Sequence, residues 1–280
     1  MKILLISSNP QFADALGERF TQRGRTCVVA EPELGEGEQA LANLLSGFDA
    51  DMVISGIGIG NVDEAAREFA SLLVKVCESR HIPIVHISGS QVFDGMDGGR
   101  HREEDPALPA SRRGALLWQI EELVRAMPRH VILRTGPMFS SRGDNLLTRL
   151  LAEFRRGGSI ERSAHGQTCP ISADDLARVV SAIVDQLSCD ADCWGTYHYS
   201  SSDPVSSYQF AETVLAVASQ YLDTEALKLS LDIAPEKDTQ WPGPLLNCDK
   251  IRNTFGIKQM PWRSSINSVI KQVFEGELNE

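Results

Sequence analysis

Short apolar runs alternate with amphipathic stretches through the first half of the chain. The runs are continuously apolar rather than alternating, and they lie at residues 2–6, 26–30, 51–55, 83–88 and 130–135. Continuous runs predict strands that are buried on both faces, as in a parallel sheet covered by helices. Amphipathic spacing predicts helices between these strands, at about residues 10–23, 36–46, 62–80 and 111–126. This repeated order predicts an α/β fold with a doubly wound parallel sheet of the Rossmann type.

The rhythm changes after about residue 140. Helices are then expected near residues 144–156, 173–187, 206–219 and 264–275, with an isolated strand near 196–200. We predict two units from this change. Residues 1–140 form a Rossmann-like nucleotide-binding domain, and residues 141–280 form a smaller α/β lobe of the substrate-binding type, interleaved with the end of the sheet.

Composition excludes several classes of partner. The 280 residues are 42% hydrophobic and 23% charged, which is typical of a soluble globular protein. The chain has 27 Lys and Arg against 38 Asp and Glu, and the net charge of −11 disfavours nucleic acids and anionic membranes. No apolar stretch reaches the length of about 18 residues that a membrane helix needs, so a cytoplasmic protein is expected. The six cysteines are interpreted as reduced thiols, and the six histidines lack metal-site spacing, so no metal is expected.

Several motifs follow one another in a recognisable order over the whole chain. They are VDEA at 62–65, HISGSQVFDG at 86–95, EDP at 104–106, ILRTGPMF at 132–139, PISADDLA at 170–177, GTYHYS at 195–200, NCDKI at 247–251 and FGI at 255–257. In this order the chain resembles the extended short-chain dehydrogenase/reductase superfamily and, more narrowly, its dTDP-4-dehydrorhamnose reductase branch. Order over the full length carries more weight than any single motif.

The resemblance implies a dinucleotide cofactor, a nucleotide-sugar substrate and reduction at C4 of the sugar. The positions that it assigns to the cofactor are Ser7, Asn9, Gln11, Phe12, Ser55, Gly56, Gly58 and Ser88. The positions assigned to the substrate are Arg134, Asn145 and Gln167. Arg134 also ends an apolar strand at the sheet edge where doubly wound folds bind ligands, and the alternative for it is a buried pair with a carboxylate. For Asn145 and Gln167 the alternative is an ordinary solvated polar side chain.

The chain departs from the family at the phosphate-binding loop. The three glycines that let the backbone approach a pyrophosphate align with Ser7, Pro10 and Ala13. A serine Cβ and a proline without an N–H both weaken such a cradle, so NAD(P) binding is expected to be weakened. We prefer the interpretation that Pro10 opens a helix with Asn9 or Ser8 as its cap over a relocated cofactor loop.

The chain also departs at the catalytic positions. The family's Tyr and Lys align with Arg113 and Leu117, and no tyrosine of the chain has a lysine four residues later. Arginine does not act as a proton donor at neutral pH, and leucine carries no charge. The hydroxyl that would bond the substrate carbonyl aligns with Gly89, with neighbouring Ser88 or Ser90 as stand-ins. No catalytic residue is therefore assigned, and Gly89, Arg113 and Leu117 are taken as degenerate positions.

Two other features have alternative interpretations. Gly56, Gly58 and Gly60 follow a buried strand, where backbone amides could hold a nucleotide, although close packing is the commoner reason for such glycines. The resemblance also implies a homodimer or protein interface through helices 62–80 and 111–126. Trp118 is the anchor expected there, with core packing as the alternative.

These observations favour a catalytically degenerate family member that senses a nucleotide or nucleotide-sugar ligand or binds a protein. Regulatory relatives, such as the subunit attached to methionine adenosyltransferase, show that the resemblance permits this role. The alternative hypothesis is a working NAD(P)-dependent nucleotide-sugar reductase or epimerase with rearranged chemistry, using His86 or His101 as the acid.

Overall fold

A six-stranded parallel sheet forms the centre of the computed structural model, which describes residues 1–31, 41, 47–60, 62–93, 99–189, 191–223, 227–232 and 243–277. The strands lie in the order β10-β6-β4-β3-β1-β2. Their bounds are β1 (Lys2–Ile6), β2 (Thr26–Ala30), β3 (Met52–Ser55), β4 (Ile84–Gly89), β6 (His130–Thr135) and β10 (Gly195–Tyr199). Every neighbouring pair in this sheet is parallel, which confirms the predicted fold class.

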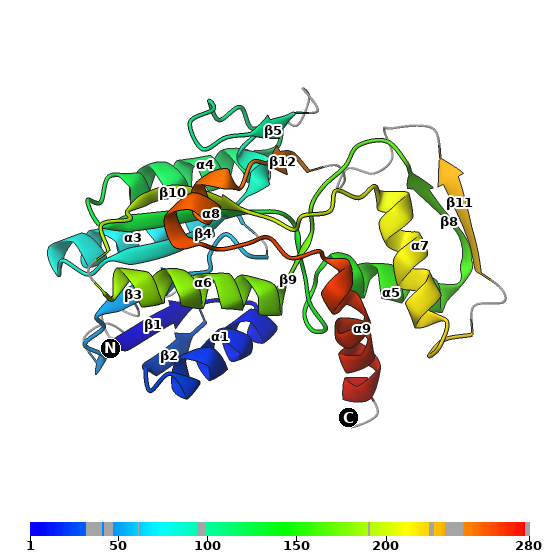
Figure 1. The fold of residues 1–280 in the computed structure, drawn as a ribbon, viewed down its shortest axis with the longest axis horizontal. Coiled ribbons are helices and arrows are strands. Elements are labelled where there is room, and N and C mark those ends of the chain that lie inside the picture. The colour runs from blue at the N-terminus through cyan, green and yellow to red at the C-terminus, as the bar shows by residue number, and fades with distance from the viewer. Residues whose placement is uncertain are drawn as a thin grey trace.

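Helices cover both faces of the sheet. The helices are α1 (Pro10–Gln22), α3 (Glu64–Ser79), α4 (Arg112–Arg125) and α6 (Ala173–Leu187). Helices α3 and α4 pack together on one face, and α1 and α6 pack together on the other (Figure 1). This covering explains why the strands carry unbroken apolar runs. The helix expected at 36–46 lies almost wholly outside the described residues.

The order of the strands places a crevice at one point of the sheet. Strand β1 pairs with β2 on one side and with β3 on the other, so the direction in which strands are added reverses there. Doubly wound sheets bind ligands in the crevice beyond the carboxyl ends of the strands at such a reversal. In this sheet the rule places the expected crevice beyond Ile6 and Ser55.

A second apolar core lies beside the sheet (Figure 1). It is built by α5 (Leu146–Arg156), α7 (Ser207–Ala218), α9 (Arg263–Glu277) and a parallel pair of strands, β8 (Gly158–Ser163) and β11 (Leu227–Asp232). The chain returns to the first core with α6, β10 and α8 (Asp249–Phe255). The division at residue 140 therefore stays a prediction.

The remaining elements are short. They are the 3-10 turn η1 (Ser90–Val92) and the two-residue strands β5 (Arg100–His101), β7 (Met138–Phe139), β9 (Ile171–Ser172) and β12 (Leu245–Leu246). Trp118 of α4 is partly buried against the first core, and the Arg125 guanidinium lies 4.8 Å from its ring centre. An interface through α3 and α4 stays a prediction. In the described part of the chain, no helix combines the length and the apolarity that crossing a bilayer would need.

Candidate ligand-binding site

Ser7 and Gly56 meet at the crevice where the strand order reverses. The Ser7 amide donates to Ala30 O at 3.1 Å, and the Gly56 amide donates to Ile6 O at 2.7 Å. A Cβ added to Gly56 would lie 3.0 Å from Ile6 O and 3.1 Å from the Ser7 Cβ and Oγ. Ser7 is only 2% exposed. The serine side chain therefore occupies space beside Gly56 that a glycine at position 7 would leave open.

The first turn of α1 is capped by the chain itself. Asn9 Oδ1 accepts a hydrogen bond from Phe12 N at 2.8 Å, and Asn9 N donates to Ser7 Oγ at 3.1 Å. Pro10 is the first helical residue and brings no amide hydrogen. Phe12 is fully buried in the core. The structure thus confirms the capping interpretation of this turn, and the amide of Phe12 is already bonded.

Gln11 connects this turn to the second part of the protein. Its Oε1 accepts from the Ser141 amide and, at 2.9 Å, from Ser141 Oγ. Its Nε2 donates to Gln272 Oε1 of α9 at 3.3 Å. Nearby, Arg142 forms an ion pair with Asp14 of α1. The loop after β7 is therefore held against the start of α1.

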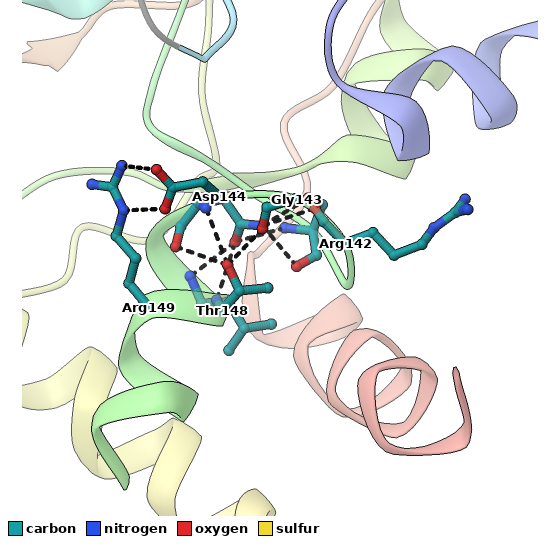
Figure 2. A network of polar contacts seen from close by, with 8 residues as sticks. Arg142, Gly143, Asp144, Thr148 and Arg149 are labelled. Carbon is teal, nitrogen blue, oxygen red and sulfur yellow. Dashed lines mark hydrogen bonds and ion pairs between the residues drawn. The ribbon is translucent and has the colours of Figure 1, made fainter. Parts of the chain in front are cut away.

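Asn145 organises that loop. It is the N-cap of α5, and its Oδ1 accepts from Leu147 N at 3.0 Å within a capping box completed by Thr148. Its Nδ2 lies within hydrogen-bonding distance of four acceptors in residues 140–143. Figure 2 shows the surrounding network, in which Asp144, just before α5, pairs with Arg149 in the first turn of α5. Gln167, which the resemblance also assigned to the substrate, is exposed in the segment between β8 and β9, and a substrate contact by Asn145 or Gln167 stays a prediction.

Gly58 passes over the end of β4. A Cβ at this position would lie 2.1 Å from Ile87 O, a distance that no side chain tolerates. Gly60, two residues later, has φ +88°, a conformation that favours glycine. Of the two interpretations of this glycine stretch, close packing accounts for Gly58. Nucleotide contact by Gly56 and Gly58 stays a prediction.

The positions that align with the family's catalytic residues lie around this loop. Arg113 Nη2 donates to Gly58 O at 2.9 Å, Nη1 donates to Gly60 O, and Nε donates to the Gln91 side chain at 3.3 Å. Leu117 is completely buried. A Cβ on Gly89 would lie 3.1 Å from Gln91 Oε1 and 3.3 Å from Leu117 Cδ1. The structure thus places a fixed guanidinium, an aliphatic core residue and a glycine at the three positions predicted to be degenerate, and the loss of acid–base chemistry there stays a prediction.

Arg134 forms a buried ion pair with Glu121 of α4. Their closest contact, Nη2 to Oε2, is 2.7 Å, and the two side chains are 1% and 0% exposed. Ser88 Oγ donates to Glu121 Oε1 at 2.6 Å, and the Phe93 ring lies 5.0 Å from the guanidinium. Arg134 therefore has the carboxylate partner that was its alternative, and a substrate contact by Arg134 or Ser88 would require this network to open.

Glu121 was missed by the sequence analysis. A signal for it does exist, because residue 121 falls on the same helical stripe as the buried Leu117 and Val124. An acidic residue within an apolar stripe needs a buried partner. The sequence alone does not say which of its arginines supplies it.

The two candidate histidine acids lie in different surroundings. His86 is fully buried in β4, its Nδ1 lies 3.1 Å from Ser55 Oγ, and burial lowers its pKa to about 4. Ser55 is itself 1% exposed. His101 is 8% exposed and stacks on Phe93 at 4.2 Å between ring centres. Neither imidazole is presented openly to the crevice.

A hollow of about 580 Å³ lies at the opposite edge of the sheet, where the strands begin. Met1, Asp51, Pro83, Arg129 and Trp194 are among the residues that line it. In a doubly wound fold, ligands bind at the carboxyl ends of the strands. The hollow lies at the amino ends, so it is not part of the candidate site.

The known proteins that this chain resembles match it over nearly its whole length. The chain matches the family model described as RmlD substrate binding domain over residues 1–275. A dTDP-4-dehydrorhamnose reductase of Sinorhizobium fredii is 27% identical, over 96% of this chain and 97% of that protein. The crystal structure of a dTDP-4-dehydrorhamnose reductase from Clostridium acetobutylicum superposes with a TM-score of 0.81 at 20% identity, covering 98% of this chain and 99% of that chain.

A second solved structure is the dTDP-4-dehydrorhamnose reductase of Bacillus anthracis in complex with NADP. It has a TM-score of 0.80 at 16% identity and covers 97% of this chain and 99% of that one. At such identities the solved structures support the shared fold. The family model extends over nearly the whole sequence, and the chain therefore belongs to the RmlD substrate-binding-domain family.

Proposed function

We propose that this protein holds a nucleotide-type ligand or a partner protein without catalysing the reduction for which its reductase relatives are named. The observation that carries the proposal is the environment of Arg113. Its guanidinium is bonded to two backbone carbonyls at the position that aligns with the catalytic tyrosine. A reductase needs a group there that releases a proton, and a guanidinium stays protonated at any physiological pH.

The neighbouring positions support the same conclusion. Leu117 is buried and apolar, so it supplies no charge that could shift the pKa of another group. Gly89 has no hydroxyl to bond a substrate carbonyl. A proton from elsewhere would have to come from a side chain that reaches the crevice, and His86 is fully buried within the sheet.

The start of α1 also does not fit a dinucleotide. Pyrophosphate binding relies on free backbone amides and on glycines that allow close approach. Here the Phe12 amide is bonded to Asn9, Pro10 has no amide hydrogen, and the Ser7 side chain packs beside Gly56. Gln11 is engaged with Ser141. These contacts support weak binding of NAD(P) or none.

Calorimetry and a turnover assay together test this proposal. Purified protein would be titrated with NADH, NADPH and dTDP, and NADPH oxidation would be followed with a dTDP-4-keto sugar present. The expected results are no micromolar binding of either reduced dinucleotide and no oxidation above the rate without protein. Micromolar NADPH binding together with turnover of the keto sugar would overturn the proposal.

The alternative, a working reductase that uses a histidine acid, makes a different prediction. It requires a measurable rate of NADPH oxidation, and this rate must fall in His86→Gln or His101→Gln. Circular dichroism must show that the variant keeps the fold of the unmodified protein. If a panel of nucleotide sugars gives no oxidation with the unmodified protein, this alternative is excluded.

A further inference from the structure

Arg113 is a half-buried cation whose hydrogen bonds all go to neutral acceptors. Its partners are Gly58 O, Gly60 O and Gln91 Oε1. Among the residues that the structure describes, no carboxylate lies within ion-pair distance of its guanidinium. The adjacent Arg112 differs, since it lies 3.8 Å from Glu64. A charge that is removed from water without an opposite charge is costly to the folded protein.

A second guanidinium increases this positive charge. Arg149, in the first turn of α5, lies near enough for its charge to lower the pKa of Arg113, although burial is the larger cause. Arg149 itself pairs with Asp144 (Figure 2), and this hydrogen-bonded pair raises its pKa. Of these two arginines, Arg113 is the one without a carboxylate partner among the described residues.

The guanidinium of Arg113 keeps unused donors. An arginine side chain has five N–H groups. Three are directed at the acceptors named above, one each from Nε, Nη1 and Nη2. One N–H thus remains on each terminal nitrogen. Neighbouring N–H groups of a guanidinium can bind two oxygens of a phosphate or a carboxylate.

We propose that Arg113 is an anion-binding residue of the crevice, and that it takes two oxygens of a phosphate or carboxylate group on a small ligand. The backbone carbonyls of Gly58 and Gly60 fix its guanidinium in place, so little side-chain freedom is lost on binding. The family resemblance implies a neutral phenol at the aligned position of the reductases, which would not supply this charge. The inference deepens the proposed function and rests on it, since it assigns the crevice a ligand that is held by charge rather than reduced.

Titration with two simple anions tests the proposal. Inorganic pyrophosphate and citrate would be titrated into the whole protein by calorimetry at low ionic strength, one probe for each oxyanion class. Saturable binding of either is expected, and the stronger one identifies the class. Since a charge-assisted hydrogen bond contributes about 1.5–3 kcal/mol, Arg113→Gln should weaken binding by at least about tenfold. Arg113→Lys keeps the positive charge but loses the planar guanidinium. Its affinity for the anion should lie between that of the unmodified protein and that of Arg113→Gln.

Arg156 supplies the matched control. It is an exposed arginine in the last turn of the same helix as Arg149. Arg156→Gln removes one positive charge from the surface and should leave the affinity unchanged. Thermal melting of each variant would verify that it is folded. The proposal is overturned if neither anion binds saturably to the unmodified protein, or if Arg113→Gln and Arg156→Gln bind as tightly as each other.

The same preparations separate this inference from the proposed function. NADPH oxidation with a dTDP-4-keto sugar would overturn the proposed function, whatever the anion titrations give. Absence of oxidation together with absence of anion binding would overturn only the assignment of Arg113.

Discussion

Replacing Glu121 with alanine would leave the Arg134 guanidinium charged and without its carboxylate partner inside the protein. Nη2 of Arg134 lies 2.7 Å from Oε2, and Nε lies 3.0 and 3.1 Å from the two carboxylate oxygens. Two charged hydrogen bonds of about 1.5–3 kcal/mol each give a loss of about 3–6 kcal/mol. Removing one partner from other buried ion pairs costs about 3–5 kcal/mol. We therefore expect Glu121→Ala to lower the free energy of unfolding by about 3–5 kcal/mol.

Equilibrium unfolding in urea, followed by circular dichroism, measures this loss. Glu122→Ala is the control, because Glu122 is the next residue of α4, is 53% exposed and pairs with Arg125 at the surface. The control should cost less than about 1 kcal/mol. Replacing both members of the buried pair, as Glu121→Leu with Arg134→Met, should recover much of the stability, since no uncompensated charge remains. A loss below about 1 kcal/mol for Glu121→Ala would refute the assignment of the pair as a closely coupled buried unit.

Stability should fall as the pH drops from about 6.5 toward 4, because buried His86, with a pKa lowered from 6.5 to about 4, takes up its proton mainly in the unfolded chain. The free energy of unfolding should have fallen by about 3 kcal/mol at pH 4. His86→Gln should make the free energy of unfolding nearly constant over this pH range. If the pH profile of the variant matches that of the unmodified protein, His86 is not the cause of the loss. Gly58→Ala should lower the melting temperature because its Cβ would lie 2.1 Å from Ile87 O, whereas Gly17→Ala, with open space in α1, should raise it slightly. Equal melting temperatures for the two variants would count against the close approach at Gly58. Asn145→Ala should cost about 1–2 kcal/mol in urea unfolding because α5 loses its N-cap, and hydrogen exchange should speed up first at the start of that helix.

The parallel sheet and its covering helices could be predicted from the chain alone. Strands such as Met52–Ser55 are buried along their whole length, so every residue is apolar or small and the run is visible in a short window. Local chemistry likewise fixed the start of α1, where Asn9 and Pro10 occupy the cap and the first helical position. The order of motifs along the chain also identified the family over its full length.

The hydrogen-bond and ion-pair partners in the candidate site come from residues far apart in the sequence. Gln11 and Ser141 are 130 positions apart, and Arg113 and Gly60 are 53 apart. A pattern within one helix or strand shows that a side chain is polar and where it lies on its element, but not which partner the strand order brings to it. The sequence by itself thus determined the fold and the family, and the loss of catalytic groups that it predicts stays a prediction. Only the tertiary structure decided that Arg134 is neutralised by Glu121 while Arg113 faces carbonyls, because pairing depends on how distant elements pack.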